Sequence, residues 1–254
     1  MNDLPPARAA ATLIIFRDRE DSPAELLMME RSRKMDFAAG ALVFPGGAVD
    51  EADAELAAAH GGGLAVDEAA ARIAAIRETL EESGLVLGLR NCPDADLACQ
   101  IRERMKQGES FAALLGEYGL ELDLAQFVPF ARWLPNVRPR NYDTRFYLAR
   151  LPVDSHAPCV DATENVRLFW ASARDVLDRA GKEGEAHVIF PTRRNLERLA
   201  QFSDYASAAA HARSFGVRTI TPWIEERTDG RHLCIPDDLG YPVTSESVTT
   251  ALRG

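Results

Sequence analysis

The alternation of apolar and polar positions along the chain predicts strands interspersed with a small number of helices. Short apolar runs, typical of buried strands, occupy residues 12–16, 25–30, 41–44, 85–89, 127–134, 144–151 and 167–170. Spacings of three and four residues, typical of helices, occupy residues 68–83, 94–118 with a break near Gly108, 172–180 and 192–202. This order of elements favours an α/β (α+β) protein, an α/β/α sandwich around a mixed β-sheet.

The predicted helix over residues 68–83 has an apolar face and an acidic face. Positions i, i+3 and i+4 share one side of a helix, so two sets of side chains separate. The apolar set, expected to pack on the sheet, is Ile73, Ile76 and Leu80. The acidic set is Glu78, Glu81 and Glu82. Asp67 is the expected N-cap, and Gly84 suits the left-handed position that ends a helix.

The acidic face has the chemistry of a divalent-metal platform. Glu78 and Glu82 are four positions apart and repel each other unless a cation lies between them. Carboxylate oxygens are the ligands that Mg²⁺ prefers, and Arg77 can hold one carboxylate from the side. Upstream, the Phe44-Pro45-Gly46-Gly47 turn offers backbone carbonyls and close approach to an anionic substrate. Together these features predict metal-dependent cleavage of a diphosphate linkage; the alternative is a solvated helix face.

The stretch Arg77-Glu78-Thr79-Leu80-Glu81-Glu82-Ser83-Gly84-Leu85 resembles the Nudix box, the signature of the Nudix hydrolase superfamily. It departs from the pattern at Thr79, where an apolar residue is usual. Asp53 stands where the first half of the box has Glu. The spacer between the two halves, residues 54–76, is longer than the pattern, and residues 54–66 are expected to form a surface excursion. The resemblance implies the Nudix fold and hydrolysis of a nucleoside diphosphate–X linkage.

Two further stretches resemble one branch of that superfamily, the coenzyme A and acyl-coenzyme A diphosphatases. Residues 27–47 match the spacing of the coenzyme A diphosphatase signature, but Asp36 replaces an expected Arg. Residues 132–135 and 140–147 are similar to the acyl-coenzyme A branch, which also interrupts its box. The implied products are 3′,5′-ADP and (acyl-)4′-phosphopantetheine.

The resemblance also implies roles for individual residues. The expected catalytic residues are Glu78, Glu81, Glu82 and Arg77, with Mg²⁺ or Mn²⁺ as the cofactor. The expected metal ligands are Glu78, Glu81, Glu82 and Glu164. The expected substrate-binding residues are Arg31, Gly46, Gly47 and Arg145. Glu78 is either a third ligand or the general base, and Trp133, Phe146 and Tyr147 either stack an adenine, line an acyl channel or belong to the core.

Two alternative functions remain open at this stage. Asp36 favours the same chemistry on ADP-ribose, NADH or a dinucleoside polyphosphate. The other alternative is a non-catalytic nucleotide-binding domain of the same fold, although this chain retains all three glutamates of the box. The helical segment 94–118 is either a cap over an acyl pocket or a packing appendage.

Composition limits the partners and suggests the domain organisation. The net charge of −10 disfavours binding to a nucleic-acid backbone, so a small molecule is the expected partner. No apolar run reaches roughly 18 residues, which predicts no membrane partner. The four cysteines lack metal-binding spacing, which favours reduced thiols and a cytoplasmic location. Because Nudix proteins are often dimers, the resemblance also allows a homodimer.

The expected organisation is a flexible tail (1–8), a catalytic domain (9–203) and a C-terminal helical extension packed on it (204–254). The domain would carry two insertions, at about 54–66 and 92–120.

Overall fold

The structure is a computed structural model that describes residues 6–32, 39–135, 141–159, 165–182 and 186–251. Its centre is an eight-stranded sheet with the order β3-β2-β1-β6-β5-β8, in which β4 also pairs with β1 and β7 with β2. The β1–β6 and β5–β8 pairs are parallel and the others antiparallel, so the predicted mixed sheet is confirmed. The strands are β1 (Arg8–Arg17), β2 (Glu25–Arg31), β3 (Leu42–Val43), β4 (Gly46–Ala48), β5 (Val128–Trp133), β6 (Tyr142–Arg150), β7 (Asn165–Ala171) and β8 (Thr219–Ile220).

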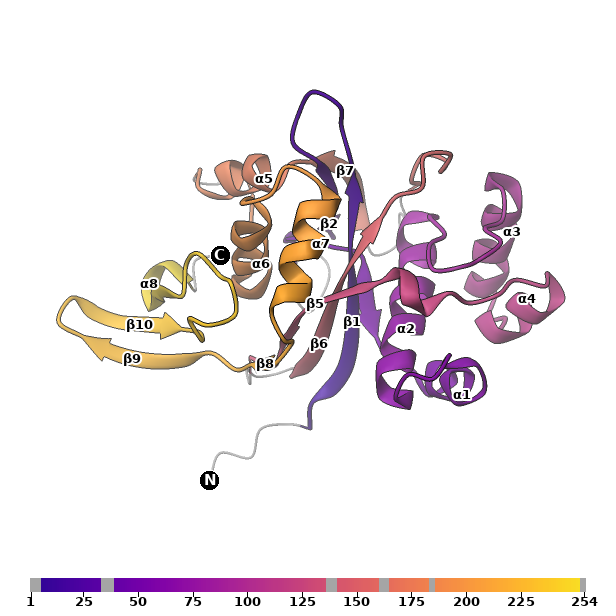
Figure 1. The fold of residues 1–254 in the computed structure, drawn as a ribbon, viewed down its shortest axis with the longest axis horizontal. Helices are drawn as coiled ribbons and strands as arrows, with labels where there is room; N and C mark the ends of the chain where they lie inside the picture. Colours follow the sequence, from indigo (N-terminus) through magenta and orange to yellow (C-terminus); the bar gives the residue numbers. More distant parts are fainter. Residues whose placement is uncertain (1–5, 33–38, 136–140, 160–164, 183–185, 252–254) are drawn as a thin grey trace.

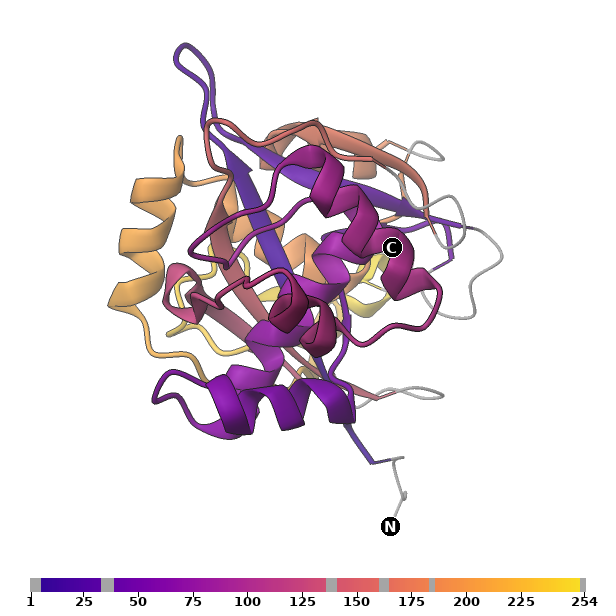
Figure 2. The same cartoon turned by 90° about the vertical axis from the view of Figure 1, so that its right-hand side faces the viewer.

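Helices cover both faces of this sheet, which confirms the predicted α/β/α sandwich (Figures 1 and 2). One face carries α1 (Glu51–His60), α2 (Val66–Ser83), α3 (Ala95–Lys106), α4 (Phe111–Glu117) and the short 3₁₀ helix η1 (Leu124–Gln126). The other face carries α5 (Ala173–Ala180), α6 (Phe190–Leu199) and α7 (Tyr205–Ser214). Two apolar cores result, one on each side of the sheet.

The alternation of side chains along β1 builds both cores. Leu13 and Ile15 belong to the core beneath α2, whereas Ile14 and Phe16 belong to the core beneath α6 and α7. All four are buried, so β1 is a central strand with an almost continuous apolar sequence.

One edge of β1 is shared between two strands. Ala10, Ala11 and Thr12 pair with β4, and Phe16 and Arg17 pair with β2. The other edge of β1 runs parallel to β6. This division brings the glycines of β4 into the middle of the molecule, against the last turns of α2.

The predicted surface excursion over residues 54–66 does lie mostly at the surface, but its first part belongs to helix α1, which packs on α2 through the buried Ala57. Two other local predictions need correction. Residues 85–89 are irregular apart from a single bridge between Leu89 and Leu122. Helix α2 begins at Val66 after Ala65, so Asp67 lies inside the first turn instead of capping it. The predicted break near Gly108 is confirmed, since it separates α3 from α4.

The C-terminal segment is more than a helical extension. Helix α7 belongs to the layer that covers the sheet, and β8 extends the sheet itself. Beyond them, β9 (Trp223–Arg227), β10 (Gly230–Cys234) and β11 (Ser245–Ser247) form an antiparallel sheet, followed by α8 (Val248–Ala251). The ring of Tyr241 packs edge-on against Trp133 of β5 at 5.9 Å between centroids. No helix in the described part of the chain is long and apolar enough to span a membrane.

Candidate active site

The acidic face of α2 is turned toward the glycines of β4. The helix ends as predicted at Gly84, which adopts φ 73° and donates its N–H to Leu80. Of the three glutamates in its last two turns, Glu81 is the most exposed and Glu82 is buried, with 5% of its surface accessible. The acidic face is therefore a partly enclosed wall rather than an open platform.

Gly46 and Gly47 are both in contact with this wall. The N–H of Gly46 donates a hydrogen bond of 2.8 Å to Oε2 of Glu82. Gly46 has a positive φ of 154° and lies so close to the β1 backbone that a Cβ would overlap Ala11. A Cβ on Gly47 would overlap the carboxylate of Glu78. Close approach of the β1 backbone thus requires glycine at position 46, whereas a side chain at position 47 would have to displace the Glu78 carboxylate. The predicted close approach of these glycines to an anionic substrate stays a prediction.

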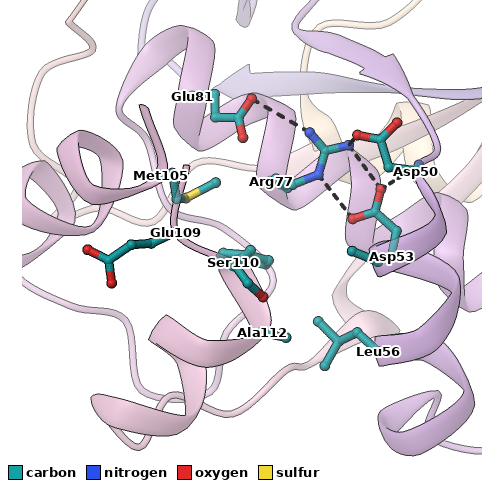
Figure 3. A pocket seen from close by; sticks show the side chains of 11 residues that line it. Asp50, Asp53, Leu56, Arg77, Glu81, Met105, Glu109, Ser110 and Ala112 are labelled. Carbon is teal, nitrogen blue, oxygen red and sulfur yellow. Dashed lines mark hydrogen bonds and ion pairs between the residues drawn. The ribbon is translucent and has the colours of Figure 1, made fainter. Parts of the chain in front are cut away.

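Arg77 joins the two halves of the interrupted box (Figure 3). Its Nε and Nη2 donate to the two carboxylate oxygens of Asp53 at 3.0 and 2.9 Å. Its Nη1 donates to Glu78 at 2.9 Å and lies 3.6 Å from Glu81. Burial alone would lower the pKa of Arg77, but the bond to Asp53 and the charges of the three acids raise it above its ordinary value.

Asp53, which stands in the sequence where the box has a glutamate, is the acid that pairs with Arg77. It lies in the first turn of α1, is 2% exposed, and also accepts the N–H of Asp50 at 2.9 Å. The long spacer leaves this pair intact because α1 folds back along α2. The local sequence did not identify this role, since the pair joins residues 24 positions apart.

Two of the glutamates bind protons more readily than an ordinary glutamate. Burial raises the pKa of Glu78 to about 7; the neighbouring charge of Glu81 adds to the shift, and Arg77 opposes it. Burial likewise raises the pKa of Glu81. Keeping the Glu78 and Glu81 carboxylates ionised therefore costs free energy, and a bound cation would reduce that cost.

The donors at this wall suit a hard divalent cation, because they are carboxylate oxygens. Among the described residues, however, no three acidic, histidine or cysteine side chains already converge as a metal-binding group. Glu82 faces the Gly46 N–H and Glu78 faces Arg77. The ligand assignment of Glu78, Glu81 and Glu82 therefore stays a prediction.

A cavity of about 530 Å³ opens in front of the glutamates. Its opposite wall contains Trp133 of β5 together with Tyr142, Thr144 and Phe146, which alternate along one face of β6. The first residues of α6, Pro191 and Thr192, close a further side. The lining charged residues are Arg8, Arg31, Asp50, Arg77, Glu78, Glu81 and Glu82.

The two predicted substrate-binding arginines are in different environments. Arg31 lines this cavity, and its buried Nε has no hydrogen-bond partner in the part of the chain that is described. Arg145 points to the other face of β6, where it pairs with Asp67 at 2.6 Å and Glu68 at 3.3 Å at the start of α2. The structure therefore does not bring Arg145 to the glutamates, and its predicted substrate contact is not supported.

The aromatic candidates also differ in whether they line the cavity. Tyr147, like Arg145 an odd-numbered position of β6, is buried on the α2 side beneath Arg72 and lines no part of the cavity. Trp133 and Phe146 are both buried core residues and cavity walls. Glu164 and Asp36 lie outside the described residues.

Sequence analysis did not identify Arg102, which binds the end of α2. It projects from α3, is 5% exposed, and donates to the backbone carbonyls of Glu81 at 2.8 Å and Glu82 at 3.3 Å. A cation at the carboxyl end of a helix satisfies carbonyls that have no partner within the helix and favours its dipole. The segment predicted as the insertion 92–120 is thus hydrogen-bonded to the backbone of two of the glutamates. Nothing in the local sequence distinguishes Arg102 from Arg104 of the same helix.

Comparison with known proteins assigns the family. No family model matches the chain. It is 30% identical over 205 residues to nudix hydrolase 7 of Caenorhabditis elegans, an alignment that covers 78% of this chain but only 62% of the worm protein. It is 28% identical to the acyl-coenzyme A diphosphatase of Gallus gallus, over 86% of this chain and 73% of that protein.

A solved structure agrees with these relatives. The crystal structure of a Nudix hydrolase from Alicyclobacillus acidocaldarius superposes with a TM-score of 0.70 at 30% identity, covering 82% of this chain and 97% of that one. The chain therefore belongs to the Nudix hydrolase superfamily, and its mixed sheet flanked by helices is the Nudix fold. Members of this superfamily generally hydrolyse diphosphate bonds and typically use a divalent metal.

Proposed function

We propose that this chain is a metal-dependent hydrolase that cleaves coenzyme A or acyl-coenzyme A to 3′,5′-ADP and (acyl-)4′-phosphopantetheine. The observation that carries the hydrolase part is the wall formed by Glu78, Glu81 and Glu82, which faces Gly46 and a cavity large enough for a nucleotide. In the reaction, a water oxygen bonds to one phosphorus and the bridging P–O bond of the diphosphate breaks. The bridging oxygen leaves with the other phosphate.

Glu81 and Glu82 are the proposed ligands of Mg²⁺ or Mn²⁺, and Glu78 is a third ligand or the proton acceptor. When bound, such an ion lowers the pKa of water and neutralises phosphate charge. The residues of the chain have a separate task, which is to keep the three carboxylates in place. Arg77 and Asp53 do so for Glu78, and Gly46 does so for Glu82.

Three features support coenzyme A as the substrate. Residues 27–47 carry the spacing of the coenzyme A diphosphatase signature. Within it, Arg31 lines the cavity, its Nε has no hydrogen-bond partner among the described residues, and a planar guanidinium suits a phosphate group. The similarity to an acyl-coenzyme A diphosphatase of Gallus gallus supports the same branch.

The test is a substrate panel with Mg²⁺ and then Mn²⁺, with the products identified by mass. The panel contains coenzyme A, short- and long-chain acyl-coenzyme A, ADP-ribose, NADH and diadenosine polyphosphates. Release of 3′,5′-ADP as the fastest reaction is the expected result. AMP from ADP-ribose or NADH would reject coenzyme A but keep the hydrolase. Turnover that survives in both Glu81→Gln and Glu82→Gln would reject the glutamate wall as the site.

A further inference from the structure

A second pocket adjoins the proposed active site on the other side of Arg77. It has a volume of about 170 Å³ and lies among α1, the glutamate helix α2 and the segment that joins α3 to α4. Asp50, Arg77 and Glu81 line both this side pocket and the main cavity. In Figure 3, Glu81 lies at one end of the side pocket, and Leu56 and Ala112 lie at the other. The two spaces therefore share Arg77, Asp50 and Glu81 as a common border, next to the carboxylates where the diphosphate would be cleaved.

The side pocket has an apolar interior and an acidic border. Its apolar residues are Ala52, Leu56, Met105, Phe111 and Ala112. Its acids already have partners, since Asp53 binds Arg77 and Glu109 binds Arg104 at 2.6 Å. Arg77 is the single cation among the described residues that line this pocket, and its donors are taken by Asp53, Glu78 and Ala48. An anionic group would thus be repelled by these carboxylates and would find the one lining cation already paired, whereas a neutral, largely apolar group would meet matching surface.

We propose that the side pocket binds a segment of the neutral pantetheine chain of the substrate, while the main cavity binds the nucleotide half. This inference rests on the proposed function and specifies where the second half of the substrate lies. A buried apolar cavity of about 150 Å³ binds benzene, so a pocket of this size accepts a short chain segment but no nucleoside. The main cavity, at about 530 Å³, is the one with room for the nucleoside.

The proposal gives the insertion between α2 and β5 a role in specificity. Met105 at the end of α3 and the segment from Glu109 to Ala112 supply one wall of the side pocket, and Leu56 of α1 supplies the facing wall. Both α1 and the α3–α4 pair come from the segments predicted as insertions. They therefore do more than pack on the domain, because together they form a binding surface beside Glu81.

The first experiment uses the methionine methyl groups as reporters. Met105 lines the side pocket, whereas Met28 and Met29 are fully buried in β2 and serve as internal references. The protein with ¹³C-methyl methionine is titrated, in Mg²⁺, with each expected product separately. 4′-Phosphopantetheine should shift the Met105 resonance and leave the references in place, and 3′,5′-ADP should not shift it. A Met105 signal that ignores 4′-phosphopantetheine in a protein that hydrolyses coenzyme A would overturn the inference.

The second experiment fills the pocket from either wall. Ala112→Trp and Leu56→Trp should raise KM for coenzyme A by about tenfold, the effect expected for a lost apolar contact. The matched control is Ala113→Trp on the exposed side of the same helix, which should behave as wild type. Binding of 3′,5′-ADP should be unchanged in all three. Equal KM values in all the folded variants would reject the side pocket; lack of turnover of every coenzyme A species by wild type would reject the proposed function instead.

Discussion

Arg77 donates two hydrogen bonds to the carboxylate of Asp53, across the interruption in the Nudix box. The same guanidinium bonds to Glu78, so the position of one glutamate depends on an acid in another helix. The insertion changes the length of the box without separating the residues that the box must bring together.

Asp53→Asn should therefore weaken both stability and turnover. It leaves Arg77 buried with fewer compensating charges, and breaking a buried ion pair costs about 3 kcal/mol or more. Chemical denaturation at neutral pH measures the loss. The control is Glu55→Gln, which removes an acid from the exposed side of the same helix. Equal stability of the two variants would show that Asp53 contributes no more than a surface acid.

Glu82→Gln should abolish metal-dependent turnover while the fold is retained. The reason lies in the hydrogen bond from the Gly46 N–H, which the amide oxygen of Gln can still accept. Glu82→Ala, which loses that acceptor, should lower Tm as well as turnover. Comparing Glu82→Gln with Glu82→Ala separates the effect of the lost charge from that of the lost hydrogen bond. A Gln variant with wild-type activity would remove Glu82 from the proposed ligand set.

The glutamate helix could be predicted from sequence because its information is local. Spacings of three and four residues place Glu78, Glu81 and Glu82 on one face, and Gly84 marks its end. The face of β6 on which Arg145 lies could also have been predicted from the sequence. Once Thr144 and Phe146 of β6 are assigned to the cavity, strict alternation puts Arg145 on the opposite face.

Other parts of the site depend on contacts that a local pattern does not contain. Helix α1 is itself the alanine-rich segment that precedes three glycines, and contacts of Asp53 and Ala57 with α2 fix its position. Residues 85–89 are apolar enough for a strand, but Gly88 at φ 74° turns the chain, and Leu85 and Leu87 fill the core without a strand partner. Arg102 is recognisable only from the helix end that it meets.

Gly47→Ala should reduce turnover more than it reduces stability. The added Cβ would overlap the Glu78 carboxylate and displace it, and a displacement of about 1 Å at a catalytic centre can cost about 100-fold. Gly116→Ala is the control, because nothing surrounds that position in α4 and replacing a helical glycine by alanine is favourable by up to about 1 kcal/mol. Unchanged kcat/KM in the folded Gly47 variant would show that Glu78 can move without loss.

Arg102→Met should weaken metal binding without removing any ligand. Arg102 is a positioning residue, since it holds the carbonyls of Glu81 and Glu82 and reaches no reacting atom. Loss of residues that orient metal ligands typically costs about 10- to 100-fold in affinity. Mn²⁺ binding, followed by electron paramagnetic resonance, measures this directly. Lys106→Gln removes an exposed cation from the same helix and should bind Mn²⁺ as wild type does; equal affinities would leave Arg102 with a purely structural role.

The ionisation of Glu197 should make the stability of the protein depend on pH. Glu197 lies on α6, away from the glutamate wall. Burial raises its pKa to about 7; the charge of Glu246 adds to the shift, while Arg194 at 2.7 Å and Arg193 oppose it. Its Oε2 is buried and has no hydrogen-bond partner among the described residues. Because the folded pKa lies above the ordinary 4.5, the folded state binds the extra proton between these values. The associated stability is present below pH 4.5 and is lost as the pH rises through about 7.

Glu197→Gln has no such proton to lose. Its Tm should therefore rise relative to wild type as the pH increases from about 5 to about 8, because only wild type must then ionise a buried carboxyl group. The amide oxygen of Gln can still accept from Arg194, so the comparison isolates the charge. Differential scanning calorimetry at both pH values, with Glu55→Gln as an exposed control, provides the measurement. Parallel changes of Tm in all three proteins would show that Glu197 ionises equally easily in the folded and unfolded states.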